Sequence, residues 1–237
     1  MQSIKNMKTI GILGGLGPET TSKIYHSIIN SFRKNKGGSY PSILIYNLPF
    51  PFIIENEAIV KGINSHKMLP YLIKGAKILE KSGASFGILP CNTLHKYINE
   101  IRESVKIPFL SILDETISRL KLMKIKTIGV LATETTIRDR LYDNVLKKRG
   151  IDVLYPTKIE QNNVNKIIVE ILNSKQNKTQ EKKIKAICSS LYKRGAKAIL
   201  LACTDLQIIT SNIHIPVPLI DSTEIIIQAS VRELTSK

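Results

Sequence analysis

Short apolar runs alternate with stretches of helical periodicity along most of the chain. The run at 8–13 ends in glycines, which is typical of a buried parallel strand that leads into a turn. Because strands and helices alternate, we predict an α/β fold with parallel sheets. The other predicted strands are 42–48, 86–89, 127–131, one near Val153, 198–201 and a last short strand bracketed by Pro216 and Pro218. The predicted helices are 19–34, 68–82, 93–104, 115–124, 137–148, 164–172, 181–194 and 224–234.

The second half of the chain repeats the first. The segment GASFGILPCNT at 83–93 matches GAKAILLACTD at 195–205, and TIGIL at 9–13 returns as TIGVL at 127–131. A repeat this long indicates duplicated domains, because the repeats of a solenoid are far shorter. The cysteines of the two matching segments therefore occupy equivalent positions.

The duplication predicts two similar α/β lobes related by pseudo-two-fold symmetry. We expect the first lobe to comprise 1–113 and 222–237 and the second to comprise 114–221, with the last helix crossing back to pack on the first lobe. If the lobes close on each other, a shared cleft presents one sulfur from each side. That geometry suits chemistry on both faces of one carbon.

Composition is that of an ordinary soluble globular protein, with 43% hydrophobic and 23% charged residues. Glycines and a proline break the apolar patch near the N-terminus, so neither a signal peptide nor a membrane span fits, and we expect a cytoplasmic protein without a membrane partner. The net charge is +16, but the lysines are spread along the chain and Trp is absent. We therefore expect no nucleic-acid partner and consider a basic cleft that attracts anionic substrates.

The glycine cluster GILGGLGPETT at 11–21 places a turn between a predicted strand and a predicted helix. Backbone N–H groups at such a helix start can bind a carboxylate or phosphate. The spacing matches neither the dinucleotide nor the P-loop fingerprint. A tight turn with Thr20 and Thr21 capping the helix explains the cluster equally well.

The chain has three cysteines, an odd count that favours reduced thiols over a disulfide framework. Cys91 and Cys203 both follow a predicted strand, where a helix N-terminus lowers a thiol pKa and donors such as Asn92 and Thr93 face an oxyanion. Cys188 lies in an apolar helical stretch and is predicted to be buried in the core.

Other polar residues lie near these cysteines. Thr204 and Asp205 follow Cys203 and supply a hydroxyl and a carboxylate. His95, four residues after Cys91, fits a catalytic role as well as a solvent-facing or capping one. The cysteine and histidine spacing does not match a zinc signature, so we expect no metal.

Four motifs, in this order, resemble the aspartate/glutamate racemase superfamily, and specifically its aspartate racemase branch. They are GGLGPETT at 14–21, PCNTLH at 90–95, GVLATETT at 129–136 and ACTD at 202–205. The resemblance covers nearly the whole chain. It implies Rossmann-like lobes with the active site between them, catalysis without pyridoxal phosphate or another cofactor, an amino acid or carboxylic acid substrate, and a homodimer.

By this resemblance one cysteine removes the substrate α-proton and the other delivers a proton to the opposite face. Cys91 and Cys203 take these catalytic roles, Asn92, Thr93 and Thr204 hold the substrate carboxylate, and Leu16 closes the pocket. The full set of implied substrate-binding residues is Leu16, Phe50, Asn92, Thr93, Thr133, Thr204 and Asp205.

The chain departs from the aspartate racemase pattern where that pattern has cations. The loop after the second strand, NLPFPFIIENE at 47–57, lacks the Arg that commonly pairs with a substrate carboxylate. The Lys that precedes the second cysteine in the family falls near Leu172, with Lys175 as the closest substitute, and Asp205 replaces the usual Glu. A pocket lined by Phe50 and Phe52 favours a less acidic amino acid or a related small carboxylate.

The leading hypothesis is therefore a cytoplasmic amino-acid racemase that uses two cysteines. One alternative is an isomerase or decarboxylase of the same fold that acts on a small carboxylic acid. Another is a binding protein that has kept the scaffold without turnover. A basic nucleic-acid binder rests on net charge alone.

Overall fold

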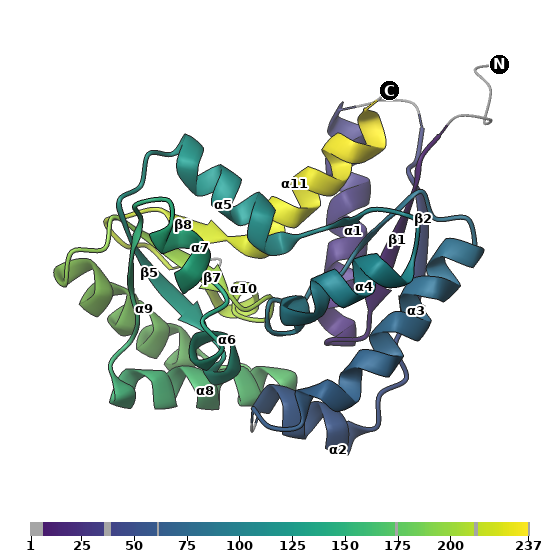
Figure 1. Ribbon diagram of the computed structural model, residues 1–237. Helices are drawn as coiled ribbons and strands as arrows, with labels where there is room; N and C mark the ends of the chain where they lie inside the picture. Colours follow the sequence, from purple (N-terminus) through teal and green to yellow (C-terminus); the bar gives the residue numbers. More distant parts are fainter. Residues whose placement is uncertain (1–6, 36–38, 61, 174, 211–212, 237) are drawn as a thin grey trace.

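The computed structural model describes residues 7–35, 39–60, 62–173, 175–210 and 213–236, and these form two lobes, each built on a four-stranded parallel sheet (Figure 1). The first sheet contains β1 (Thr9–Gly14), β2 (Ser42–Asn47), β3 (Phe86–Ile88) and β4 (Phe109–Leu110). The second contains β5 (Thr127–Ala132), β6 (Asp152–Leu154), β7 (Ala198–Ala202) and β8 (Leu219–Asp221). The strand orders β2-β1-β3-β4 and β6-β5-β7-β8 are equivalent, which confirms the predicted α/β fold with two similar lobes.

Helices connect the strands in both lobes. In the first lobe they are α1 (Pro18–Asn35), α2 (Phe52–Glu55), a π-helical turn η2 (Asn56–Val60), 3-10 turns η3 (Ser65–Met68) and η4 (Thr93–Tyr97), α3 (Leu69–Lys81) and α4 (Ile98–Ser104). The remaining helices are α5 (Ile112–Leu122), α6 (Glu134–Arg138), α7 (Asp143–Lys147), α8 (Lys158–Leu172), α9 (Lys178–Lys193), α10 (Gln207–Thr210) and α11 (Ser222–Thr235).

Each sheet is buried on both faces, as parallel sheets require. Successive side chains of β1 alternate between the faces, so Ile10 and Ile12 pack with α1 and α11 while Leu13 packs on the α3 side. In the second lobe, Val130 packs with α5 and Leu131 with α8 and α9. The carboxyl ends of the central strands are thereby held rigidly, and the turns that follow them carry the candidate chemistry.

Two long helices connect the lobes. Ile117 and Leu120 of α5 pack in the core of the second sheet, whereas Ile226 and Ile227 of α11 pack in the core of the first. Figure 1 shows α11 running from β8 back toward α1, with α5 beside it. The chain therefore returns to the first lobe at its end.

Two predicted elements are wrong. The helix predicted at 137–148 is split into α6 and α7, because Arg140 adopts a left-handed conformation with φ of 52° and interrupts the helical path. The last strand lies after Pro218 rather than between the two prolines, since proline has no N–H to donate to a ladder. The carbonyl of Pro218 accepts a hydrogen bond from Ile199 at the edge of that strand.

Candidate active site

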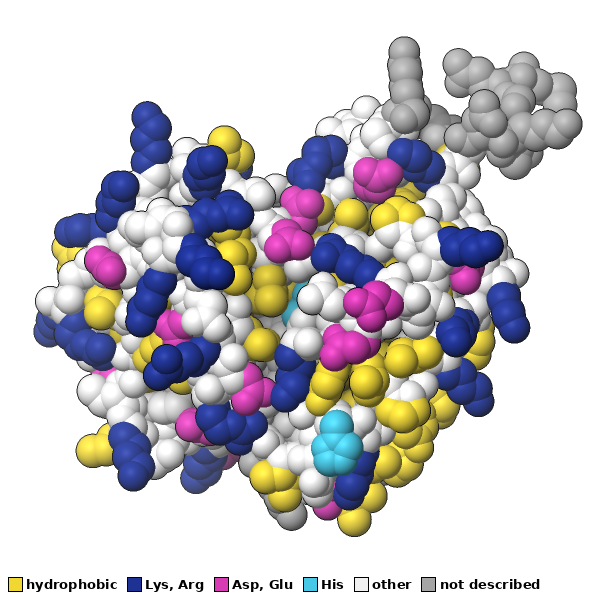
Figure 2. All heavy atoms as spheres, in the orientation of Figure 1, with side chains coloured by type: hydrophobic (Ala, Val, Ile, Leu, Met, Phe, Trp, Pro, Cys, Tyr) yellow, Lys and Arg dark blue, Asp and Glu magenta, His cyan; other side chains and the backbone are white. Residues whose placement is uncertain are grey.

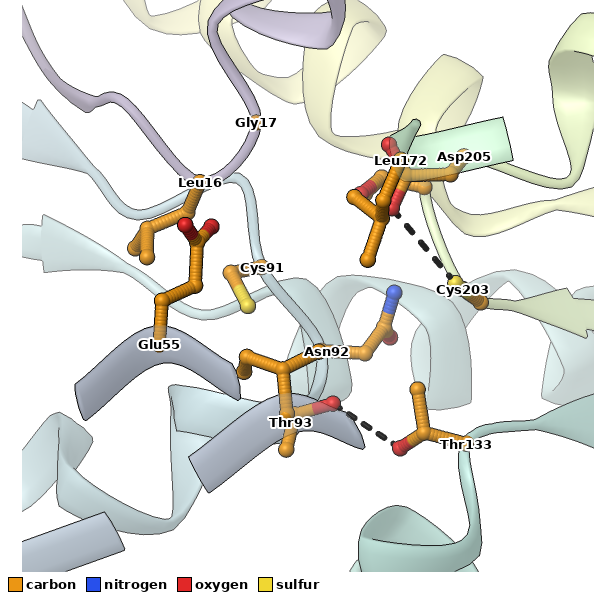
Figure 3. A pocket seen from close by; sticks show the side chains of 12 residues that line it. Leu16, Gly17, Glu55, Cys91, Asn92, Thr93, Thr133, Leu172, Cys203 and Asp205 are labelled. Atoms are coloured by element: carbon orange, nitrogen blue, oxygen red, sulfur yellow. Dashed lines mark hydrogen bonds between the residues drawn. The ribbon is translucent and has the colours of Figure 1, made fainter. Parts of the chain in front are cut away.

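A small pocket lies between the two lobes, at the carboxyl ends of their strands (Figure 3). The first lobe contributes Leu16, Gly17, Glu55, Ile59, Cys91, Asn92 and Thr93. The second lobe contributes Thr133, Leu172, Cys203, Thr204 and Asp205. The pocket thus brings together both cysteines of the duplicated segments and all but one of the other predicted site residues.

Phe50 is the predicted site residue that is not among the described residues lining this pocket. Its ring packs against Tyr71 instead, with the ring centroids 5.2 Å apart, at the edge of the first-lobe core. The side chain of Phe52, predicted to line the pocket with it, lies outside what the structure describes. An apolar run after a strand does not reveal which of its side chains face the core.

The glycine-rich turn after β1 forms one wall of the pocket. Gly15 has a φ of 93°, and a Cβ there would lie 2.8 Å from the backbone nitrogen of Leu48, so only glycine fits. The Thr21 hydroxyl accepts a hydrogen bond from Gly15 and donates one to the carbonyl of Gly17. Thr20, predicted to cap the helix, instead donates across the pocket to Asp205 at 2.7 Å.

Cys91 lies shortly after β3, beyond Leu89 and Pro90, and in front of the 3-10 turn η4. Burial raises the pKa of its thiol to about 12, although the backbone N–H groups of Leu94 and Thr93 lower it. The expectation of a depressed pKa is therefore wrong, because desolvation of the charged form outweighs the helix-end donors. The Cys91 thiol is protonated at neutral pH.

His95 holds the backbone at Cys91 and is not solvent-facing. The Ile112 N–H donates to Nε2 at 2.9 Å, so Nδ1 carries the proton and donates to the Cys91 carbonyl at 2.8 Å. Burial lowers the pKa of His95 to about 4, and the imidazole is neutral. The ring fixes the cysteine turn to the start of α5.

Cys203 follows β7 and has a carboxylate beside it. Its thiol donates to Oδ2 of Asp205 at 3.8 Å, the contact drawn in Figure 3. Burial raises the pKa of Cys203 well above its usual value, and the Asp205 charge raises it further. Burial also raises the pKa of Asp205, while hydrogen bonds from Thr20 and Cys203 lower it. Asp205 is thus positioned to accept the Cys203 proton.

Asn92 reaches toward the second lobe from the turn after Cys91. Its Oδ1 accepts a hydrogen bond from the Tyr142 hydroxyl at 2.5 Å, and its Nδ2 donates to the Ser222 hydroxyl at 3.0 Å. Ser222 in turn donates to the carbonyl of Leu201. Among the described residues Nδ2 makes this one hydrogen bond, so the second N–H of the Asn92 amide is available to a bound molecule.

Three threonine hydroxyls form a network between the lobes, and two of them, those of Thr93 and Thr133, belong to residues that line the pocket. Thr93 lies 3.0 Å from Thr133 and 3.2 Å from Thr136, and the two second-lobe hydroxyls are 3.0 Å apart. Thr133 also accepts a hydrogen bond from the Thr136 N–H, so it caps α6. The network fixes Thr93 and Thr133 at their places in the lining.

The pocket also contains residues that the sequence did not single out as part of the site. Glu55 ends α2, Ile59 lies in η2, and Gly17 precedes α1. Leu172, at the end of α8, lines the pocket where the family resemblance led us to look for a lysine. Lys175, the closest substitute, is exposed and is not among the described lining residues.

In this structure the pocket has a volume of about 20 Å³, which is room for about one water molecule. An amino acid is several times larger. Leu16, Glu55 and Leu172 reach into the space from three different segments, so binding requires these side chains or the lobes themselves to separate.

The remaining predictions concern cysteine packing, metals, charge and membranes. Cys188 is fully buried in the second-lobe core, as predicted. Within the described ranges, no group of three His, Cys, Asp or Glu side chains is arranged to hold a metal ion. Figure 2 shows Lys and Arg spread over both lobes of the visible face rather than gathered in one patch. Over the same described ranges, every helix is too short or too polar to cross a membrane.

The fold and the pocket define a two-lobed α/β protein with paired thiols in the cleft between duplicated domains. The family model for Asp/Glu/Hydantoin racemase matches residues 13–230, and the chain belongs to this family. The predicted resemblance to the aspartate/glutamate racemase superfamily is thereby confirmed.

Individual relatives agree with this assignment. The chain is 35% identical over 229 residues to the broad specificity amino-acid racemase RacX of Bacillus subtilis. The matched region covers 94% of this chain and 96% of that protein. The structure of Picrophilus torridus aspartate racemase superposes with a TM-score of 0.80 at 27% identity, covering 97% of this chain and 95% of that one. An aspartate racemase homologue from Pyrococcus horikoshii gives the same TM-score and identity, covering 97% and 100%.

Proposed function

We propose that this protein is a cofactor-independent amino-acid racemase in which Cys91 and Cys203 act on opposite faces of the substrate α-carbon. One observation carries the proposal: the two cysteines follow equivalent strands of duplicated lobes and line the same pocket. The Bacillus subtilis relative is named a broad specificity amino-acid racemase, which supports amino acids as the substrate class.

The proposed reaction needs one thiolate and one thiol. Asp205 accepts the proton of Cys203, and the resulting thiolate removes the α-proton from one enantiomer. The Cys91 thiol then delivers its proton to the opposite face of the carbanion. The cysteines thus exchange protonation states in each turnover, and the reverse reaction begins with Cys91 as the base.

The carbanion must be stabilised, because an α-proton is only weakly acidic. In the proposed complex the hydroxyls of Thr93 and Thr204 and the free N–H of Asn92 donate to the substrate carboxylate, where negative charge develops. Closure of the lobes removes water from the pocket and strengthens these interactions. The raised pKa values of both thiols arise from the same exclusion of water.

The experiment is an assay of all common amino acids, supplied as single enantiomers in deuterated water. The proposal predicts formation of the opposite enantiomer with solvent deuterium at the α-carbon. Parallel screening of small carboxylic acids for isomerisation and CO2 release tests the alternative of a related isomerase or decarboxylase. Tight binding of an amino acid without any exchange would instead favour a binding protein. The cytoplasmic location and the homodimer stay predictions.

A further inference from the structure

The charges that line the pocket have one sign. Glu55 and Asp205 are both in the lining, and the described lining residues include no Lys, Arg or His. A third carboxylate, Glu19, lies close enough to raise the pKa of both. Lys23 lowers the pKa of Asp205 from outside the lining. A substrate with a second carboxylate would therefore meet two carboxylates in the lining and no cation among the described lining residues.

Glu55 differs from Asp205 in its partners. Asp205 already accepts hydrogen bonds from Thr20 and Cys203. In the described part of the chain, the Glu55 carboxylate has no hydrogen-bond or ion-pair partner, although the side chain is half-buried. Burial raises its pKa first, and the charges of Asp205 and Glu19 raise it further. An incoming cation would stabilise the charged carboxylate and so oppose this rise in pKa.

The position of Glu55 fits the far end of a substrate. In Figure 3 its carboxylate lies beside Leu16 and across the pocket from Asn92 and Cys203. Leu16, Ile59 and Leu172 add apolar surface to the same lining. An aliphatic stem that ends in an ammonium group matches this combination, because such chains bury their methylenes and keep the charge paired.

Building on the proposed racemase function, we propose that the preferred substrate is an amino acid with a cationic side chain, such as lysine or ornithine, whose terminal ammonium group pairs with Glu55. The α-carboxylate would then lie at the Asn92, Thr93 and Thr204 end, and the α-carbon between the two sulfurs. Glu55 acts in this proposal as a specificity-determining residue and takes no part in the proton transfers.

The test compares lysine with norleucine, which has the same carbon chain but lacks the terminal ammonium group. A buried charge-assisted pair predicts a kcat/KM for lysine that is about 10- to 100-fold higher than for norleucine in the unmodified protein. In Glu55→Gln this ratio falls to about one, chiefly by loss of lysine activity. Glu103→Gln, an exposed change on α4 with the same effect on net charge, leaves the ratio unchanged.

The outcomes separate this inference from the proposed function. No racemisation of any amino acid overturns both. Racemisation that is as fast with norleucine or aspartate as with lysine overturns the cationic preference and leaves the racemase proposal intact. Equal losses with lysine and norleucine in Glu55→Gln would show that Glu55 binds the α-ammonium group or supports the fold, which also overturns it. The comparison in the unmodified protein needs no variant, so it decides the preference even if Glu55→Gln does not fold.

Discussion

The turns that carry Cys91 and Cys203 differ in their side chains although they follow equivalent strands. At Cys91, backbone N–H groups of η4 face the sulfur and His95 holds the carbonyl. At Cys203, backbone N–H groups of Asp205 and Leu206 also face the sulfur, but the Asp205 carboxylate accepts a hydrogen bond from the thiol as well, and the short α10 follows. Equivalent strand ends thus carry the two sulfurs, and in the part of the chain that the structure describes only the Cys203 thiol has a carboxylate as its hydrogen-bond acceptor. The position of each sulfur and its protonation are therefore set by different residues.

The same contrast extends to how each turn is tied to the rest of the molecule. The Cys91 turn is fixed by buried neutral groups, since Asn92 bonds to Tyr142 and Ser222 and His95 bonds to Ile112. The Cys203 turn is tied by Asp205, which reaches Thr20 of the other lobe. The first turn is therefore held by packing and hydrogen bonds, and the second by a group that can change charge.

Removing either thiol is expected to have the largest effect. Cys91→Ser or Cys203→Ser should each lower kcat/KM for racemisation by about 10³-fold or more, because each proton transfer needs its own acid or base. Chiral chromatography of the product measures this. Cys188→Ser, which alters a core thiol outside the pocket, serves as the control and keeps its activity if the protein folds. Normal racemisation by either pocket variant would contradict the two-cysteine mechanism.

Asp205→Asn is expected to slow proton abstraction by Cys203 more than proton abstraction by Cys91. It should lower kcat/KM by about 10- to 100-fold, because it removes the acceptor of the Cys203 proton. The loss must be equal for both enantiomers, since these have the same free energy in solution. The primary deuterium isotope effect should rise only for the enantiomer whose proton Cys203 removes. An isotope effect that rises equally for both enantiomers would mean that Asp205 serves both sulfurs.

His95→Gln is expected to change the pH dependence of the free energy of unfolding, because it removes the buried imidazole that is bonded to the Cys91 carbonyl. His95 titrates near 4 in the folded protein and near 6.5 when unfolded, so the unfolded state binds more protons between these values. Neutral His95 makes its full contribution to the free energy of unfolding above about pH 6.5, and this contribution is lost as the pH falls toward 4. Between pH 7 and pH 5 this loss amounts to about 2 kcal/mol.

Urea unfolding at the two pH values measures this effect as the difference between the unmodified protein and the variant. His26→Gln, which changes an exposed histidine, should behave like the unmodified protein. The comparison with variants is needed because burial raises the pKa of Asp205 and Asp221, whose contributions have the opposite sign. The same pH dependence in His95→Gln and the unmodified protein would show that His95 does not stay neutral when the protein is folded.

Tyr142→Phe is expected to have the smallest effect. It leaves Oδ1 of Asn92 without its hydroxyl donor, so the amide is oriented less firmly and kcat/KM should fall by about 3- to 10-fold. Steady-state kinetics measure the loss. Tyr155→Phe, in the same second-lobe core but away from the pocket, should leave kcat/KM unchanged. Unchanged kinetics in Tyr142→Phe would show that the orientation of Asn92 does not limit the reaction.

The sequence predicted the parts of this protein that follow from local pattern and from duplication. The apolar runs around Ile10 and Leu200 marked buried strands, and the repeated segment placed Cys91 and Cys203 at equivalent strand ends. Parallel strands end at one edge of a sheet, so the side chains after them converge there. Asp205 is predicted because it follows Cys203 in the repeated segment, whereas Leu16 and Thr133 enter the predicted site through the motifs that resemble the racemase superfamily.

The remainder of the site could not be predicted because it depends on tertiary contacts. Glu55 and Ile59 lie in two short helical turns without regular periodicity, and nothing local indicates that these turns cover the pocket. The bond from Thr20 to Asp205 joins residues from opposite lobes. The raised pKa of Cys91 also depends on burial by the folded chain, since a strand-end position alone suggests the opposite shift.

The most direct test of the two-cysteine account is proton NMR of the α-position during turnover of L-lysine and, separately, D-lysine in deuterated water. The account predicts that each enantiomer yields the other with deuterium at the α-carbon, and that both Cys91→Ser and Cys203→Ser abolish this conversion. Inversion that retains the original proton, or conversion that continues in the protein lacking both thiols, would contradict it.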